Sequence, residues 1–155
     1  MAGETSAGVL AWRRGPDGPQ VLLVHPGGPY WAGKDAAAWS IPKGLAEPGE
    51  GLWPAARREF AEELGQPIEG GAPVALTPHR LPGGKLVAAF LVEADLDVSA
   101  VASTSFEMEW PPRSGRRARF PEIDRAGWFD SEAALAKVHK GQRPILLEAF
   151  ERLKA

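Results

Sequence analysis

The sequence GLAEPGEGLWPAARREFAEELG, from Gly44 to Gly65, contains the clearest helix of the chain. The spacing of its apolar residues predicts a helix over Leu52–Leu64. Pro54 is tolerated there because it falls in the first turn, and Gly65 stands where helices commonly end. A loop rich in glycine and acidic residues therefore leads directly into a helix whose last turns carry several carboxylates.

Three glutamates, Glu59, Glu62 and Glu63, stand at positions i, i+3 and i+4 of this helix and share one face. Their charges repel one another, and near the C-terminal end of a helix each also loses about 0.3–1 kcal/mol to the helix dipole. A divalent cation reverses this balance, because Mg²⁺ and Mn²⁺ take carboxylate oxygens as ligands. The glutamates indicate either a metal site or a solvated acidic face balanced by Arg57 and Arg58.

The spacing around the glutamates favours the metal site, because the segment resembles the Nudix box, G-x5-E-x7-R-E-U-x-E-E-x-G-U with U an apolar residue. The positions that match in register are Gly44, Glu50, Arg58, Glu59, Phe60, Glu62, Glu63 and Gly65. The final apolar position is Gln66, which departs from the pattern. The lead-in WSIPKG (39–44) and the later Glu122 with Trp128-Phe129 also look like the family, so the resemblance extends across the domain.

The resemblance implies a fold and an activity. The expected fold is one α/β domain over residues 1–155, a Nudix-type α/β/α sandwich with a curved mixed sheet and an insertion at about residues 97–119. The implied activity is Mg²⁺-dependent hydrolysis of a phosphoanhydride bond in a nucleoside diphosphate linked to another group. Dinucleoside polyphosphates or (deoxy)nucleoside triphosphates are favoured because the chain has no extra domain. An RNA 5′-end pyrophosphohydrolase and a non-catalytic nucleotide-binding module are the alternatives.

The same resemblance implies a ligand set for the metal. Glu59, Glu62 and Glu63 are expected to bind Mg²⁺, or Mn²⁺ as a substitute, together with the carbonyl of Gly44. A glycine suits that position because a backbone without a Cβ approaches an ion closely. Either Glu59 or Glu62 is also expected to take the proton of the attacking water.

Three further residues have implied roles around the box. Arg58 is expected to organise the site by forking onto Glu50 or Glu62 rather than to bind metal. Glu122 is expected to reach the metal cluster, or to act as the base, from a mobile loop. Lys43 either contacts phosphate as a point charge or points to solvent.

A second motif precedes the box. Gly28, Gly33 and Lys34 match the G-x-x-x-x-G-K pattern of a phosphate-binding P-loop. A P-loop needs Ser or Thr after the lysine and the start of a helix behind it, whereas Asp35 follows here and a proline soon interrupts any helix. We therefore expect that this segment is not a P-loop.

The loop over residues 26–38 is instead predicted to shape the substrate pocket. Tyr30 and Trp31 offer aromatic faces on which a base can stack. The alternative is that these two side chains are only a hydrophobic anchor for the loop.

Length and composition limit the classes to which the chain can belong. Its 155 residues suffice for one domain, and a formal net charge of −2 gives no overall attraction to nucleic acid or to an anionic membrane. The chain has no cysteine, which excludes disulfides and thiolate metal sites. The N-terminus lacks the pattern of a signal peptide, and the longest apolar run is too short to span a bilayer. We expect a cytoplasmic protein with a small-molecule nucleotide substrate and no membrane partner; the sequence leaves its oligomeric state open.

The remaining segments predict alternating strands and helices. Strands are expected at residues 6–13, 21–25, 39–42, 73–81, 85–95 and 125–130, and helices at residues 131–140 and 143–154. Phe106, Met108 and Trp110 alternate onto one face and predict an amphipathic strand. A run of arginines, which could attract polyphosphate or RNA, comprises Arg113, Arg116, Arg117 and Arg119.

Overall fold

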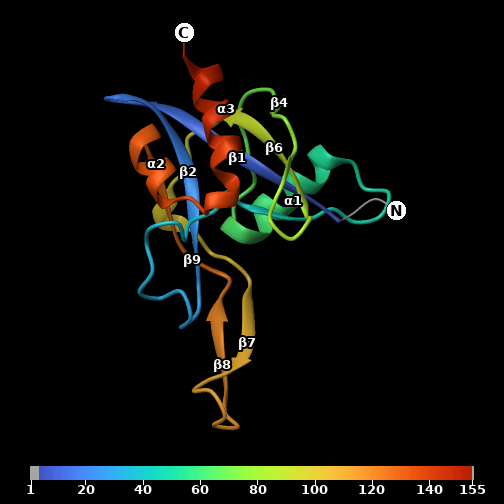
Figure 1. Ribbon diagram of the computed structural model, residues 1–155, viewed down its shortest axis with the longest axis vertical. Helices are drawn as coiled ribbons and strands as arrows, with labels where there is room; N and C mark the ends of the chain where they lie inside the picture. The colour runs from blue at the N-terminus through green and yellow to red at the C-terminus, as the bar shows by residue number, and fades with distance from the viewer. Residues whose placement is uncertain (1–3, 155) are drawn as a thin grey trace.

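A curved mixed sheet lies at the centre of the computed structural model, which describes residues 4–154 (Figure 1). Strands β1 (Thr5–Gly15) and β2 (Gly18–Pro26) form an antiparallel hairpin. β6 (Leu86–Glu93) pairs with β1 in parallel, and β9 (Ile123–Phe129) pairs with β2 in antiparallel orientation. The central strand order is therefore β6-β1-β2-β9, which confirms the expected mixed sheet.

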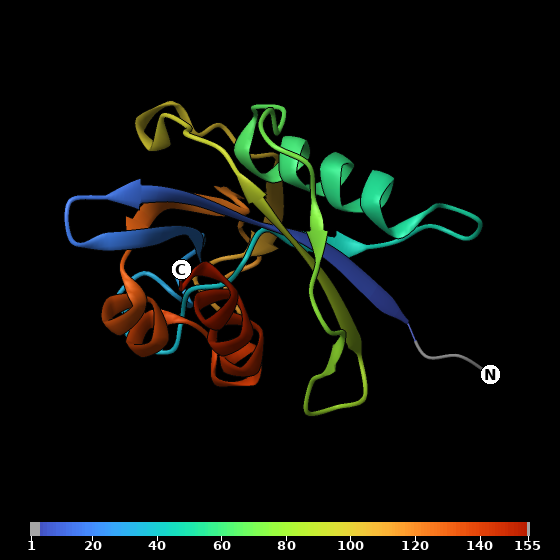
Figure 2. The same cartoon turned by 90° about the horizontal axis from the view of Figure 1, so that it is seen from above.

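Helices cover both faces of this sheet (Figure 2). One face packs against α1 (Leu52–Leu64), and the other packs against α2 (Ser131–Lys137) and α3 (Arg143–Leu153). Successive strand residues point to opposite faces, so Leu22 belongs to the core under α1 and Leu23 to the core under the other two helices. Each fully buried side chain of this size contributes about 1.5–3 kcal/mol. The arrangement is the expected α/β/α sandwich.

The prediction of a strand at residues 39–42 is wrong, because this segment makes only isolated β-bridges. The strand here is β3 (Lys43–Leu45), which follows the segment and pairs with β1. Pro42 explains the shift, because it has no N–H to donate to a ladder. Its carbonyl group still accepts a hydrogen bond from the Val9 amide at 3.1 Å, which holds the segment beside the sheet.

The strand expected at residues 73–81 is interrupted. It consists of two short strands, β4 (Val74–Ala75) and β5 (His79–Arg80), each paired with β6. Between them the Thr77 amide donates to the Glu148 carboxylate of α3 at 2.9 Å instead of to a neighbouring strand. The proline after Thr77 removes a further donor, so the ladder cannot continue.

The C-terminal helices are shorter than expected at their ends. α2 stops at Lys137 because the next residue leaves the helix and bridges to Trp39, whose amide donates to the Lys137 carbonyl at 2.9 Å. A short 3₁₀ turn, η2 (Lys140–Gln142), then leads into α3. None of the helices in the described part of the chain is long and apolar enough to cross a membrane.

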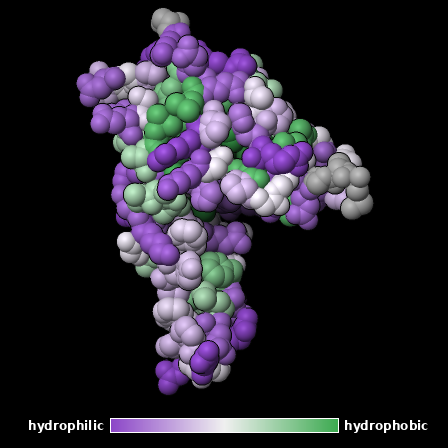
Figure 3. Space-filling view, viewed as in Figure 1, coloured by the Kyte–Doolittle hydropathy of each residue, from purple (hydrophilic) through white to green (hydrophobic). Residues whose placement is uncertain are grey.

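The segment expected as an insertion at residues 97–119 contains regular structure. A 3₁₀ turn, η1 (Val98–Ala100), is followed by β7 (Ser105–Glu109) and β8 (Arg117–Pro121), which pair with each other as a separate two-stranded sheet. This hairpin projects away from the central sheet (Figure 1) and forms the lower protrusion of the space-filling view (Figure 3). Its strand β7 confirms the predicted amphipathic strand for Phe106 and Met108, which are half-buried between exposed neighbours. Trp110 was wrongly included, because the strand ends at Glu109 and Trp110 is exposed.

Candidate active site

The C-terminal half of α1 and strand β3 form the centre of the candidate site. Gly65 ends the helix in the left-handed conformation, at φ 69°, and its amide donates to the Ala61 carbonyl at 2.8 Å. Gly44 of β3 lies so close to Glu59 that a Cβ atom on Gly44 would overlap the Glu59 carboxyl group. The backbone of β3 is therefore held against the glutamate face of the helix.

Arg58 is the hydrogen-bonding centre of this region. Its guanidinium donates to Glu50 through Nε at 3.0 Å and through Nη2 at 2.9 Å, and Nη2 also donates to the Leu45 carbonyl at 3.1 Å. Nη1 donates to Glu59 at 2.9 Å and to Glu62 at 3.4 Å. The hydrogen bonds from Arg58, followed by one from the Glu47 amide, lower the pKa of Glu50 to about 2. Glu50 is thus held ionised as the structural partner of Arg58.

Glu63 is the least solvated carboxyl group of the helix face. Its Oε2 accepts a hydrogen bond from the Lys43 backbone amide at 3.2 Å. Burial, reinforced by the negative charge of Glu59, raises the pKa of Glu63 to about 8. Burial also lowers the pKa of the Lys43 ammonium group. This pocket therefore disfavours an isolated charge and favours a bound counter-charge.

Within the part of the chain that the structure describes, no three histidine, aspartate or glutamate side chains converge closely enough to hold a metal as they stand. Arg58 accounts for this, because it pairs with Glu59 and Glu62 while Glu63 turns toward the backbone of β3. The donor set nevertheless fits a hard divalent cation, because it supplies carboxylates on one helix face and a close backbone at Gly44.

Glu122 lies beside this face, at the bend between β8 and β9. Its negative charge contributes, after burial, to the raised pKa values of Glu59 and Glu63. Glu122 lies at a one-residue bend between two strands rather than on a long loop, and its backbone is hydrogen-bonded on both sides. Its amide donates to the Thr104 carbonyl at 2.8 Å, and its carbonyl accepts from the Gly27 amide at 2.8 Å. The side chain of Glu122 is exposed.

Three neighbouring cavities share lining residues and extend from one side of the carboxylates to the other. A cavity of about 180 Å³ contains Lys43 and Glu63 in its wall. It shares Pro26 with a cavity of about 310 Å³ lined by the 26–31 loop, Phe106, Met108 and Glu122. It shares Lys43 with a cavity of about 480 Å³ lined by Lys85, His139 and the turn from Leu81 to Gly83. Lys43 thus faces both a carboxylate and a cationic pocket.

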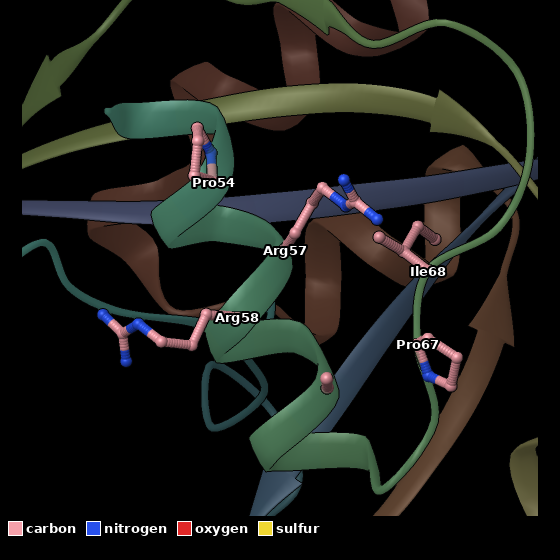
Figure 4. A pocket seen from close by; sticks show the side chains of 6 residues that line it. Pro54, Arg57, Arg58, Pro67 and Ile68 are labelled. Carbon is pink, nitrogen blue, oxygen red and sulfur yellow. The ribbon is translucent and has the colours of Figure 1, made fainter. Parts of the chain in front are cut away.

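A separate depression lies on the other side of α1. Figure 4 shows that Arg57 extends toward Ile68 while Arg58 points in a different direction from the same helix. The depression, of about 300 Å³, is lined by Pro54, Arg57, Arg58, Ala61, Pro67 and Ile68. It contains no carboxylate and is not continuous with the three cavities through any shared residue.

The loop over residues 26–38 is tied down at Lys34 rather than used as a P-loop. The fully buried His25 ring makes two hydrogen bonds, from Nε2 to the Lys34 carbonyl at 2.6 Å and between Nδ1 and Asp124 at 2.9 Å. The Lys34 ammonium group lies 4.3 Å from the centroid of the Tyr30 ring. No helix begins directly after Lys34, because residues 35–42 form turns and isolated bridges, which confirms the rejection of the P-loop.

Sequence reasoning missed two contributions to this region. His25 was not among the residues singled out in the sequence, although it connects the loop to β9. Phe106 and Met108 were interpreted only as the apolar face of a strand, although they line the cavity that contains Tyr30 and Trp31. The alternation at Phe106 and Met108 was the available signal, because a strand outside the main sheet must pack its apolar face against some other segment.

A family model for the NUDIX domain matches residues 4–149. The chain belongs to the Nudix family. The Nudix match confirms the expected enzyme class, a pyrophosphohydrolase. A comparison with curated proteins gives no match.

Solved structures resemble this Nudix chain over nearly its whole length. An Ap4A hydrolase from C. elegans, in a binary complex, is 21% identical over 97% of this chain and 98% of its own, with a TM-score of 0.65. A Nudix hydrolase from Listeria monocytogenes is 19% identical over 97% and 94%, with a TM-score of 0.66. The Nudix domain of NrtR from Shewanella oneidensis, solved with ADP ribose, is 13% identical over 99% and 90%, with a TM-score of 0.65. These likenesses concern the fold.

Proposed function

We propose that this Nudix protein hydrolyses a phosphoanhydride bond in a nucleoside diphosphate linked to another group, with Mg²⁺ bound at the end of α1. The observation that carries the proposal is the contact of Gly44 with Glu59, beside Glu63 and Lys43. Glu63 of the anionic helix face and Lys43 line one cavity, and the close backbone at Gly44 adjoins Lys43. A phosphate chain bound there is flanked by groups of both signs.

Each residue of the proposed site has a defined task. Glu59, Glu62 and Glu63, with the Gly44 carbonyl, would hold the ion, and Mn²⁺ is a suitable substitute. When bound, the ion neutralises phosphate charge and lowers the pKa of coordinated water. Arg58 keeps the box loop on the helix through Glu50.

The proton of the attacking water passes to a carboxylate in this proposal. Glu59, Glu62 and Glu122 are the candidates for the base. Glu59 is held by Arg58 at 2.9 Å, whereas Glu122 has an exposed side chain on an anchored backbone. A general base acts only within hydrogen-bond reach of the water from which it takes the proton. The carboxylate that is not engaged when phosphates are bound is therefore the favoured base.

Dinucleoside polyphosphates and (deoxy)nucleoside triphosphates are the substrates that the cavities favour. An aromatic cavity with Tyr30 and Trp31 lies on one side of Glu63, and a cationic cavity with Lys43 and Lys85 lies on the other. A nucleotide with several phosphates matches this order, because the base can stack at one end while anions continue past Lys43. The fold similarity to the C. elegans Ap4A hydrolase is consistent with this choice.

The RNA 5′-end alternative depends on the arginine run. Arg113, Arg116 and Arg117 lie at or beside the exposed tip of the β7–β8 hairpin, outside the three cavities. A longer anionic polymer could reach them, whereas a mononucleotide could not. The non-catalytic alternative is disfavoured because every glutamate of the box is present.

A substrate screen tests the proposal. The purified chain is incubated with Ap4A, Ap5A, ATP, dGTP, ADP-ribose and a 5′-triphosphorylated oligonucleotide, with Mg²⁺, with Mn²⁺ and with a chelator. We expect metal-dependent release of nucleotide or phosphate, fastest for a substrate with at least three consecutive phosphates. Binding of these compounds without release of product under any metal condition would instead identify a non-catalytic module.

A further inference from the structure

The inner face of the β7–β8 hairpin lies opposite the loop that follows β2. Phe106 and Met108 are half-buried and alternate with exposed residues, so both point to the same side of β7. Phe106 lies over Gly28, where a Cβ atom would come within 3.0 Å of its ring. The hairpin is therefore held against the loop, although it projects from the sheet.

The opposite wall of the same cavity consists of exposed aromatic surface. Tyr30 is 68% exposed and its ring lies 5.7 Å from that of Trp31, at an interplanar angle of 70°. The Lys34 ammonium group lies over both rings, at 4.3 and 5.2 Å from their centroids. A large aromatic side chain kept in place at such exposure offers a surface for stacking.

We propose that Phe106 and Met108 form the second wall of a nucleobase pocket and supply affinity for the base of the nucleotide. The base lies between the hairpin face and Tyr30-Trp31, inside the cavity of about 310 Å³. That volume is within the range of small-ligand sites. Stacking of a planar base against aromatic side chains supplies affinity that does not depend on hydrogen bonds to the edge of one particular base.

Position within the molecule identifies the occupant as the base of the substrate rather than another apolar group. Glu122 lines this cavity, and Pro26 is shared with the cavity that holds Lys43 and Glu63. An aromatic group bound here lies next to the carboxylates, where the proposed function places the phosphates. The aromatic group and the phosphates can therefore belong to one nucleotide. The inference rests on that proposed function for the identity of the ligand, but it concerns binding rather than hydrolysis.

The proposal also gives the hairpin a role that the main fold does not supply. β7 and β8 pair only with each other, so the sheet does not need them for its own hydrogen bonds. Gly27 connects them to the site, because its amide donates to the Glu122 carbonyl at 2.8 Å. The hairpin, the loop and the proposed catalytic carboxylate Glu122 are thus connected by the backbone at one point.

Calorimetric titration measures the pocket without any turnover. The ligands are the four common nucleoside 5′-monophosphates and, as a ligand without a base, ribose 5-phosphate, each with Mg²⁺ present. The variants are Phe106→Ala, Phe106→Leu and Met108→Ala. The matched control is Phe120→Ala, because Phe120 faces Phe106 across the hairpin with ring centroids 6.0 Å apart but does not line the cavity.

We expect at least one nucleotide to bind the wild type about tenfold or more tightly than ribose 5-phosphate does. Phe106→Ala should weaken the binding of that nucleotide at least about fivefold, because a stacking partner is lost. The affinity for ribose 5-phosphate should not change. Phe106→Leu keeps apolar volume but has no aromatic ring, so its affinity for that nucleotide should lie between those of the wild type and Phe106→Ala. Phe120→Ala should stay within about twofold of the wild type.

Two results overturn the proposal. One is a wild type that binds every nucleotide no more tightly than ribose 5-phosphate. The other is an equal loss in Phe106→Ala and Phe120→Ala, which would make the hairpin a structural element only. If the wild type hydrolyses nucleotides but Phe106→Ala binds them with unchanged affinity, the pocket proposal is wrong and the proposed activity stands. If binding depends on the base but no nucleotide is hydrolysed, the proposed activity is wrong and the pocket proposal stands.

Discussion

Arg58 holds Glu50 by two parallel hydrogen bonds, from Nε to Oε2 at 3.0 Å and from Nη2 to Oε1 at 2.9 Å. The same guanidinium reaches Glu59 at 2.9 Å. One side chain thus connects the loop before α1 to the glutamate face of α1. Lysine cannot reproduce this, because its ammonium group is a point charge without the planar fork.

Replacement of Arg58 by lysine should therefore lower turnover by about tenfold or more, even though the charge is kept. A tenfold loss corresponds to about 1.4 kcal/mol of transition-state stabilisation. Arg57→Lys is the matched control, because Arg57 leaves the same helix in a different direction (Figure 4). Steady-state kinetics of Arg58→Lys, Glu50→Gln and the double variant should show losses that are less than additive. Fully additive losses would contradict a shared role.

Glu63→Gln should lower turnover at least about 100-fold and weaken Mg²⁺ binding. The substitution keeps the size of the side chain and removes the negative charge, and electrostatic and metal contributions to catalysis amount to several kcal/mol. Kinetics over a range of Mg²⁺ concentrations, with calorimetric titration of the metal, measure both effects. Glu151→Gln on the exposed side of α3 serves as the control. Wild-type turnover in Glu63→Gln at saturating Mg²⁺ would refute the role.

The same carboxyl group predicts how stability depends on pH in the absence of metal. The pKa of Glu63 is raised from an ordinary value of 4.5 to about 8, chiefly by burial and then by the charge of Glu59. The folded state therefore binds the proton more tightly than the unfolded state, and the free energy of unfolding falls as the pH rises from about 4.5 to about 8. With a chelator present, the melting temperature should fall more steeply over this range in the wild type than in Glu63→Gln. Mg²⁺ should reduce this difference in slope between the wild type and Glu63→Gln. Parallel pH profiles of the two proteins in the presence of the chelator would contradict the prediction.

The two lysines near the site should differ in importance. Lys43 lines both the carboxylate cavity and the cationic cavity, so Lys43→Met should lower kcat/KM by about tenfold or more. The Lys34 ammonium group lies on the Tyr30 and Trp31 rings, so Lys34→Met should change kcat/KM by less than about tenfold. Steady-state kinetics with one nucleotide substrate compare the two. Abolished hydrolysis in Lys34→Met, with the fold intact, would restore the P-loop hypothesis.

Glu122→Gln should lower kcat while it leaves the Mg²⁺ affinity of the free enzyme within about threefold. The side chain of Glu122 is exposed on an anchored backbone, so it can approach the reacting groups by rotation once substrate is bound. Kinetics and metal titration, run beside Glu63→Gln and the control Glu107→Gln, distinguish the two carboxylates. Weakened metal binding in the free Glu122→Gln variant would place Glu122 among the permanent ligands.

Local patterns in the sequence were sufficient for the helix, its ends and the glutamate face. The period of an α-helix places Glu59, Glu62 and Glu63 together whatever surrounds them, and Gly65 ends the helix through its own backbone conformation. Strands were predicted less well where a partner decided them. Prolines limit the ladders at Pro42 and after Thr77, but the partner that the backbone finds instead comes from a distant segment, as with Glu148, which lies 71 residues from Thr77.

The sequence by itself determined that this chain is a Nudix hydrolase with a complete set of box glutamates, because that information lies in spacings shorter than one helix. Only the tertiary structure placed Glu122 next to α1 and Phe106 over Gly28. These contacts join segments that are far apart in the chain, and their geometry depends on strand register, which no local pattern specifies completely. The proposed chemistry thus comes from one short segment, whereas the shape of the pocket comes from the way three distant segments pack together.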